Sequence, residues 1–212
     1  MTDQEPPVGK ALRLNQQARA GPAHPKLKQA ERRTKIKLVQ IVGDPSTAKL
    51  ISDPMRRAIL NLLRRQSLTG AELAESLGLT DATVNYHIQL LRRGGLLVVA
   101  RKEEEEHGIM QKFYAPSAYL YLPDVANLPK EVARYYYPIN IERVRGVLSV
   151  GGKATGGIGP RGQDVDELGE EFAESLVQVA GGYAGTTVYQ GEGEGLVSEI
   201  YSRALSGLKR AK

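Results

Sequence analysis

The stretch that decides the fold is Leu68–Leu97, LTGAELAESLGLTDATVNYHIQLLRRGGLL. Its first half has apolar residues at helical spacing. Thr69 can cap such a helix, and Glu72 follows three residues later, which is the spacing of a capping box. Gly78 is suited to end the helix, because glycine readily adopts the left-handed conformation found there. The pattern predicts a short helix over about 70–77.

A second helix begins almost at once and occupies the second half of the stretch. Thr80 is its predicted cap, and Gly94-Gly95 follow its last turn. Three apolar residues repeat at the spacing of one helix face, namely Val84, Ile88 and Leu91. The sequence therefore predicts two helices joined by a tight glycine-containing turn, with the second helix held down along one side.

The flanking segments complete a larger pattern. Upstream, Asp53-Pro54 predicts the start of another helix that runs to about Arg65. Downstream, Leu96–Lys102 and Ile109–Ala115 are rich in strand-forming residues and predict a hairpin. Its loop would hold four consecutive glutamates and a glycine, Glu103–Glu106 and Gly108. Helices followed by such a hairpin are typical of a winged helix-turn-helix.

The segments ISDPMRRAILNLL, LTGAELAESLGLTDATVNYHIQLLRRGGLL and KFYAP, in this order, resemble the ArsR-type winged-helix regulators, particularly archaeal ones. The resemblance covers about residues 45–117. It implies a double-stranded-DNA-binding transcription regulator that forms a homodimer through helices flanking the winged domain. Classical members of that family sense metals through cysteines or histidines. Because this chain has no cysteine, we expect no such sensor and no metal or other cofactor.

A helix that enters the major groove needs a polar, compact outer face. The free face of the second helix carries Asp81, Ala82, Asn85, Tyr86 and Gln89. Asn and Gln side chains can pair with adenine, and an alanine methyl can contact thymine. We therefore predict a DNA-binding set of Thr80, Asp81, Ala82, Thr83, Asn85, Tyr86, Gln89, Arg92, Arg93, Arg101, Lys102 and Lys112, with the Lys and Arg residues on phosphates. The alternative for each is an ordinary solvated residue. His87 is expected to be a packed residue and not a ligand.

The glutamates at the hairpin tip depart from the usual wing, whose tip carries Arg or Lys for the negative minor groove. We expect Arg101 and Lys102 to hold phosphates while the acidic tip extends past the duplex. The tip could then restrain non-specific binding or meet a basic protein partner. A solvated turn without a role is the third possibility.

Composition and charge set the remaining limits. The chain has 212 residues, of which 41% are hydrophobic and 25% charged, as in ordinary globular proteins. Residues 1–35 hold eight Lys/Arg against three Asp/Glu, whereas 36–212 hold 21 of each. This basic segment lacks apolar periodicity, so we expect a disordered tail, with an arm that contacts phosphates as the alternative. We expect a cytoplasmic, nucleoid-associated protein with no membrane span.

The C-terminal region, 118–212, is less patterned. Residues 151–163 read as a glycine-rich linker and do not have the order of a phosphate-binding loop. Amphipathic helices are predicted from Asp164 to about Ala180 and from Leu196 to Leu208, with a short strand at Thr187–Tyr189 between them. Their apolar faces fit the core of a small C-terminal domain, to which the tyrosines 135–137 would add, or a dimer interface. A ligand pocket is a further alternative.

The predicted fold class is therefore mainly α with a small β-hairpin. It consists of a winged helix-turn-helix domain over 36–117 and a helical C-terminal extension for dimerisation or for effector or partner binding. No motif supports an enzyme. The function we expect is sequence-specific regulation of transcription by a homodimer. The alternative is a winged-helix protein-interaction module in a transcription or chromatin assembly.

Overall fold

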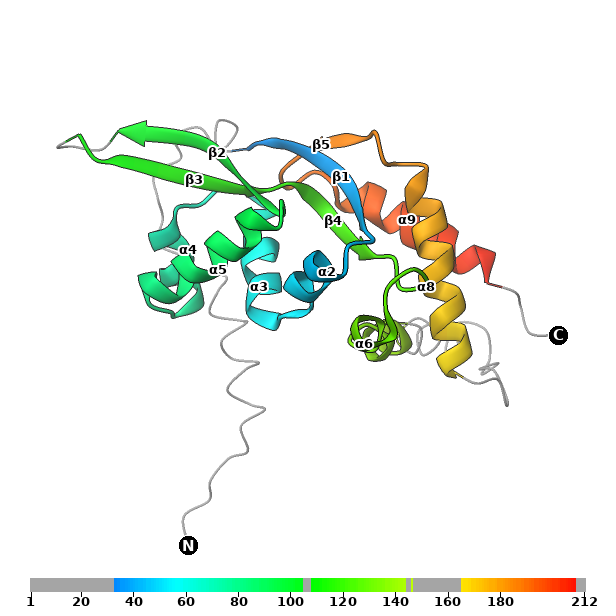
Figure 1. Ribbon diagram of the computed structural model, residues 1–212. Helices are drawn as coiled ribbons and strands as arrows, with labels where there is room; N and C mark the ends of the chain where they lie inside the picture. The colour runs from blue at the N-terminus through cyan, green and yellow to red at the C-terminus, as the bar shows by residue number, and fades with distance from the viewer. Residues whose placement is uncertain (1–32, 105–107, 144–145, 147–164, 209–212) are drawn as a thin grey trace, which may run out of the picture. The chain divides into compact units, whose positions relative to one another are not determined.

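The computed structural model describes residues 33–104, 108–143, 146 and 165–208. The described residues belong to one compact unit. Figure 1 shows its helices and strands, which are β1 (Lys35–Val42), α2 (Pro45–Ser52), α3 (Pro54–Leu63), α4 (Gly70–Leu77), α5 (Asp81–Arg93), β2 (Leu97–Glu104), β3 (Met110–Pro116), β4 (Ala118–Pro123), α6 (Lys130–Ala133), α8 (Val165–Gly181), β5 (Thr187–Tyr189) and α9 (Glu194–Gly207). A further helical segment covers 137–143.

Helices α2 to α5 and the hairpin β2–β3 form the predicted winged helix-turn-helix. Local sequence sets the helix starts, because the side chains of Asp53, Thr69 and Thr80 each accept a hydrogen bond from a backbone N–H in the first turn that follows. Both bonds of the Thr69–Glu72 capping box are present. Gly78 ends α4 with φ of 65°, a left-handed conformation that glycine adopts without strain.

A single apolar cluster holds these helices together. Leu63, Leu73, Val84, Ile88 and Leu91 are fully buried in it. Burying one such side chain contributes about 1.5–3 kcal/mol. The inner face of α5 is therefore held against the domain, as the spacing of its apolar residues predicted.

The hairpin differs from its prediction at the tip. Strand β2 continues through Glu104, so Glu103 and Glu104 pair with Gln111 and Met110 instead of lying in the loop. The sequence prediction ended the strand too early, because charged residues were taken as a turn signal although an exposed wing tolerates them. Residues 105–107, which include Glu105 and Glu106, lie outside the described residues.

A three-stranded mixed sheet was not predicted. Strand β1 lies at its centre, parallel to β4 and antiparallel to β5 (Figure 1). Val39 pairs with Leu120, and Ile36 pairs with Val188. Two predicted boundaries are corrected by this sheet. The basic tail was predicted to run to residue 35, but Lys35 begins β1. The winged domain does not end as a separate unit at 117, because β1 and β4 pair across that position.

The apolar faces of α8 and α9 are covered within the chain. Leu168, Phe172, Leu176, Ile200 and Ala204 are buried against each other and against the sheet. Of the two uses predicted for these faces, the structure shows the core of a C-terminal layer. The predicted linker at 151–163 lies outside the described residues.

The tyrosines at 135–137 lie elsewhere than predicted. Tyr136 is buried and its hydroxyl donates a hydrogen bond to the carbonyl of Ala48 in α2, so it packs with the winged-helix core. Tyr135 is exposed.

Gln190 connects the sheet to the winged-helix core. Its side chain is completely buried. Its Oε1 atom accepts hydrogen bonds from the backbone N–H of Thr34, at 2.7 Å, and from the hydroxyl of Ser67, at 3.0 Å. Its Nε2 atom donates to the carbonyl of Leu63 at the end of α3. One buried amide therefore joins three segments that lie far apart in the sequence.

Replacing Gln190 with leucine should lower the free energy of unfolding by about 2–5 kcal/mol, because three polar groups, on Thr34, Leu63 and Ser67, would lose their partner. Urea unfolding at pH 7 measures this loss. Gln178→Leu is the matched control, since Gln178 is exposed on α8, and it should change stability by no more than about 0.5 kcal/mol. Equal effects of the two substitutions would show that Gln190 does not connect the layers.

Candidate nucleic-acid interface

Helix α5 presents a polar face to solvent. Its residues Ala82, Asn85, Tyr86, Gln89 and Arg93 are exposed, whereas its apolar side is fully buried. Tyr86, with 61% of its surface exposed, is one of the most exposed large hydrophobic side chains among the described residues. A helix that is anchored on one side and polar on the other can be laid into the major groove without unfolding.

The predicted residues of α5 divide into two rows. At about 100° per residue, Ala82, Tyr86, Gln89 and Arg93 lie opposite the buried face. Asp81 and Asn85 lie on one flank and line a groove of about 330 Å³ between α4, α5 and β3. The first row faces away from the domain and the second lies beside it, so side chains of both rows are within reach of a bound duplex.

Asn85 is held close to the start of α4. Its Oδ1 atom lies 3.3 Å from the position that a Cβ atom on Gly70 would occupy. Sequence reasoning did not single out Gly70, because only the packing of the two helices shows that its missing side chain leaves room for Asn85.

Two threonine hydroxyl groups lie at the N-terminal cap of α5. The Oγ1 atoms of Thr80 and Thr83 lie 2.8 Å apart, and the Thr80 Oγ1 accepts the backbone N–H of Thr83. Both residues are exposed, so their remaining hydrogen-bonding capacity faces outward.

The hairpin places two lysines side by side. Lys102 on β2 and Lys112 on β3 are directly opposite partners in the ladder, and both are exposed. Like charges in this position repel each other, and an anion between them relieves the repulsion. The sequence indicated both lysines but not their pairing, which depends on the irregular register between Val99 and Arg101.

Arg101 is held differently from these lysines. Its guanidinium lies 3.6 Å from the centre of the Phe113 ring and forms an ion pair with Glu103. Both of these contacts of Arg101 are made within the hairpin. The sequence predicted a phosphate contact for this residue.

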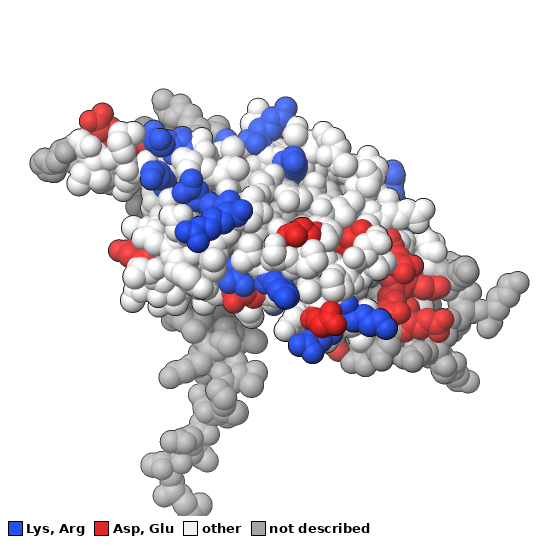
Figure 2. Space-filling view, viewed as in Figure 1, with Lys and Arg blue, Asp and Glu red and all other residues white. Residues whose placement is uncertain are grey.

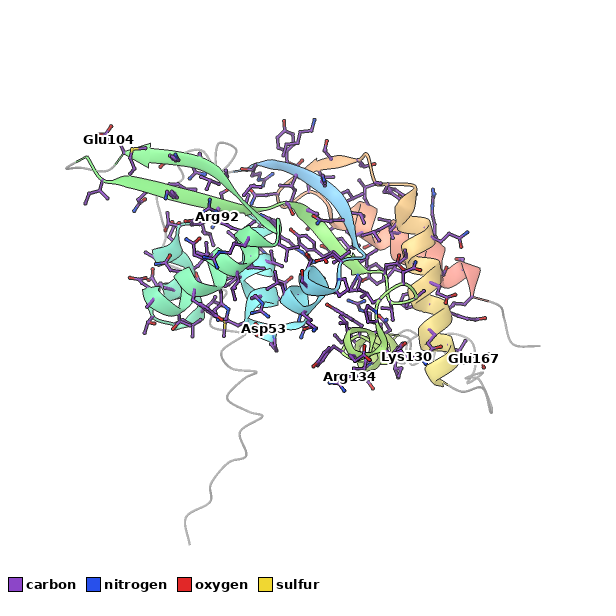
Figure 3. The ribbon with its side chains drawn as sticks, in the orientation of Figure 1. Asp53, Arg92, Glu104, Lys130, Arg134 and Glu167 are labelled. Carbon is purple, nitrogen blue, oxygen red and sulfur yellow. The ribbon has the colours of Figure 1, made fainter. Side chains whose placement is uncertain are left out.

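Positive charge continues from the hairpin onto the end of α5. Arg92 and Arg93 occupy the last turn and are exposed. Figure 2 shows Lys and Arg gathered over the hairpin and α5, where Figure 3 labels Arg92, while Asp and Glu gather over α8. The side chain of Glu104 lies near the tip of the hairpin, away from the cationic surface (Figure 3).

His87 is half-buried, as expected for a packed residue. Its ring meets the edge of the Tyr86 ring with centroids 5.4 Å apart. Its buried Nδ1 atom has no hydrogen-bond partner among the described residues. Within the same residues, no cluster of three or more His, Cys, Asp or Glu side chains could hold a metal ion. No described helix is both long and apolar enough to cross a membrane.

Comparison with known proteins agrees with this geometry. A family model described as a helix-turn-helix domain matches residues 51–100. Those residues form a helix-turn-helix domain. The transcriptional repressor SdpR of Bacillus subtilis (strain 168) is 33% identical to this chain over 54 residues, which are 26% of the chain. The match spans 60% of the length of SdpR.

If Glu103 restrains Arg101, Glu103→Gln should raise affinity for random-sequence duplex DNA about two- to fivefold, by freeing one cation and removing one negative charge from the hairpin. Fluorescence anisotropy with a labelled duplex at 0.1 M salt measures this change. Glu170→Gln makes the same charge change on the exposed surface of α8 and should leave affinity nearly unaltered. Equal affinities of the two variants would show that Glu103 does not restrain DNA binding.

Proposed function

We propose that this chain is a sequence-specific double-stranded-DNA-binding transcription regulator of the ArsR type, and that it acts as a homodimer. The observation that carries the proposal is the exposed polar face of α5 beside the paired lysines of the hairpin. Such a surface offers hydrogen-bonding groups for base edges and cations for phosphates together. The match to a helix-turn-helix domain and the similarity to a transcriptional repressor support the same function.

In this proposal, α5 lies in the major groove. Asn85 and Gln89 contact base edges, and Ala82 and Tyr86 contact bases or backbone nearby. Thr80, Asp81 and Thr83 face the backbone at the start of the helix. Phosphates are held by four exposed cations, Arg92, Arg93, Lys102 and Lys112.

The proposed homodimer places two α5 helices in successive major grooves, about 34 Å apart. The apolar faces of α8 and α9 already pack within the chain. The dimer contact therefore uses another part of the surface, and metal ions play no part in it.

The acidic hairpin tip supports a second candidate function, in which the winged helix chiefly binds a basic protein partner. Glu103 and Glu104 are exposed on the hairpin. In that case, neutral variants of these glutamates would no longer bind the partner while DNA affinity stayed unchanged.

The proposal is tested by selecting bound sequences from a random duplex library with the full chain. A palindromic consensus with half-sites one helical turn apart is expected for a homodimer. Recovery of unrelated sequences would remove the claim of sequence specificity.

On the selected duplex, Asn85→Ala should cost about 1–3 kcal/mol of binding free energy, with little change on random DNA, because the alanine cannot hydrogen-bond a base edge while the cations still hold the phosphates. Gly70→Ala should produce part of the same effect by displacing the Asn85 side chain. Anisotropy titrations measure both variants, and Gln178→Ala on α8 is the control. Equal effects on both duplexes would assign Asn85 to the DNA backbone.

The basic N-terminal segment is proposed to bind additional phosphates. Residues 1–32 contain six Lys/Arg and three Asp/Glu. Deleting them should flatten the plot of log affinity against log salt by about 0.9 for each phosphate that the segment neutralises. Titration at four salt concentrations gives the slope. A slope equal to that of the full chain would mean that the segment does not bind DNA.

A further inference from the structure

A cavity of about 550 Å³ lies where the helix-turn-helix domain meets the C-terminal layer. Its lining residues come mainly from α2, α3, β4, the helical segment 137–143, α8 and α9. Figure 1 shows where these elements lie in the fold. Its volume is in the range of small-molecule binding sites in proteins, which is about 300–1,000 Å³. The cavity is separate from the DNA-binding surface proposed for α5 and the hairpin.

Much of the wall is apolar. Leu60, Leu120 and Leu176 are buried residues that border the cavity. Tyr121 and Tyr136 border it as well, but their hydroxyls donate hydrogen bonds to the backbone carbonyls of Leu96 and Ala48. With both hydroxyls bonded inside the protein, the tyrosine rings add to the apolar surface.

Three arginines border the same cavity. Arg57 and Arg64 belong to α3 and its C-terminal cap, and Arg143 belongs to the segment 137–143. Arg57 and Arg64 are seven residues apart, so they lie on one face of the helix. Glu194 is the acidic residue of the lining, and its carboxylate accepts a hydrogen bond from the Tyr119 hydroxyl at 3.1 Å. The fixed charge around the cavity is therefore predominantly positive.

One hydrogen-bond donor of Arg64 has no partner among the described residues. This donor is the Nε atom, which is buried. A buried donor on a charged group is costly to leave unpaired. Its guanidinium lies 5.5 Å from the centre of the Tyr119 ring, and that contact leaves the Nε–H unpaired. An acceptor supplied from the cavity would satisfy this donor.

The charges of Arg57 and Arg64 affect the pKa values of two tyrosines that border the cavity. Burial raises the pKa of the Tyr136 phenol, and the positive charge of Arg57 opposes that rise. Burial likewise raises the pKa of Tyr121, and Arg64 is among the groups that oppose it. The positive charges of both guanidinium groups therefore act on the phenols that border the cavity.

We propose that this cavity binds a small organic anion with an apolar body, whose carboxylate or phosphate group is held by Arg64 with Arg57 and Arg143. The apolar body lies against the leucines and tyrosine rings. Carboxylates and phosphates are suited to the planar, multiply donating guanidinium group. The proposal does not depend on DNA binding by α5, and its test has a separate readout.

The test uses the full chain and a pair of matched fluorescent probes. 1-Anilinonaphthalene-8-sulfonate has an apolar body and an anionic group, and N-phenyl-1-naphthylamine has the same body without the charge. The anionic probe should bind once per chain and more tightly than the neutral probe. Fluorescence titration of the native protein measures affinity and stoichiometry.

Arg64→Gln should weaken binding of the anionic probe about tenfold or more, while binding of the neutral probe changes less than about twofold. Arg65→Gln is the matched control, because Arg65 is an exposed neighbour that does not line the cavity. Val197→Phe fills the cavity without changing its charge and should weaken both probes. Circular dichroism and thermal unfolding confirm that each variant is folded.

Three results would overturn the proposal. The first is no binding of the anionic probe to the native chain. The second is equal effects of Arg64→Gln and Arg65→Gln in folded protein. The third is anionic-probe binding that Val197→Phe leaves unaltered, since that would place the probe elsewhere on the surface. If Arg64→Gln does not fold, the exposed Arg143→Gln takes its place, with the same expected selectivity for the anionic probe.

Discussion

The buried amide of Gln190 is the contact on which the arrangement of the described chain depends. It bonds to Thr34 before β1, to Leu63 at the end of α3 and to Ser67 before α4. The neighbouring backbone adds a bond from the N–H of Gly191 to the carbonyl of Arg64. A buried polar group must find partners, and here the partners belong to both layers. The helix-turn-helix and the mixed sheet are therefore parts of one structure and not separate domains.

The base of the hairpin is joined to the same mixed sheet. Strand β3 ends at Pro116 and β4 begins at Ala118, so the hairpin leads into the mixed sheet through Ser117. The Tyr121 hydroxyl donates to the carbonyl of Leu96, at the start of the other arm of the hairpin. These contacts fix the base of the hairpin next to the end of α5, and Lys102 and Lys112 lie further out along its strands. Tyr121 also lines the arginine-bordered cavity that lies between the two layers.

The helix-turn-helix was predictable because its signals are local. Caps at Asp53, Thr69 and Thr80, a glycine that ends α4 and apolar residues at helical spacing each act within a few residues. The short strand Thr187–Tyr189 was also predicted. The outward positions of α5 followed from the same periodicity, and their exposure agrees with it, while their contact with DNA remains a proposal.

The mixed sheet could not be predicted in the same way. Strand β1 is parallel to β4, about 80 residues further along the chain, and no local pattern specifies that pairing. The engagement of Arg101 by Glu103 was missed because the prediction placed Glu103 in the loop, whereas in strand β2 the two residues share a face. The cavity combines residues from α2 through α9, so patterns within single segments could not indicate it. Its arginines appeared in the sequence only as surface charges.

The central claim is that the exposed face of α5 and the paired lysines of the hairpin form the DNA contact. The most direct measurement is a titration of isotopically labelled protein with the selected duplex, followed by amide chemical shifts in nuclear magnetic resonance. We predict that the largest shifts fall on residues 80–93 and around Lys102 and Lys112, with small shifts on α8 and α9. Shifts concentrated on α8 and α9, with α5 unaffected, would contradict the account.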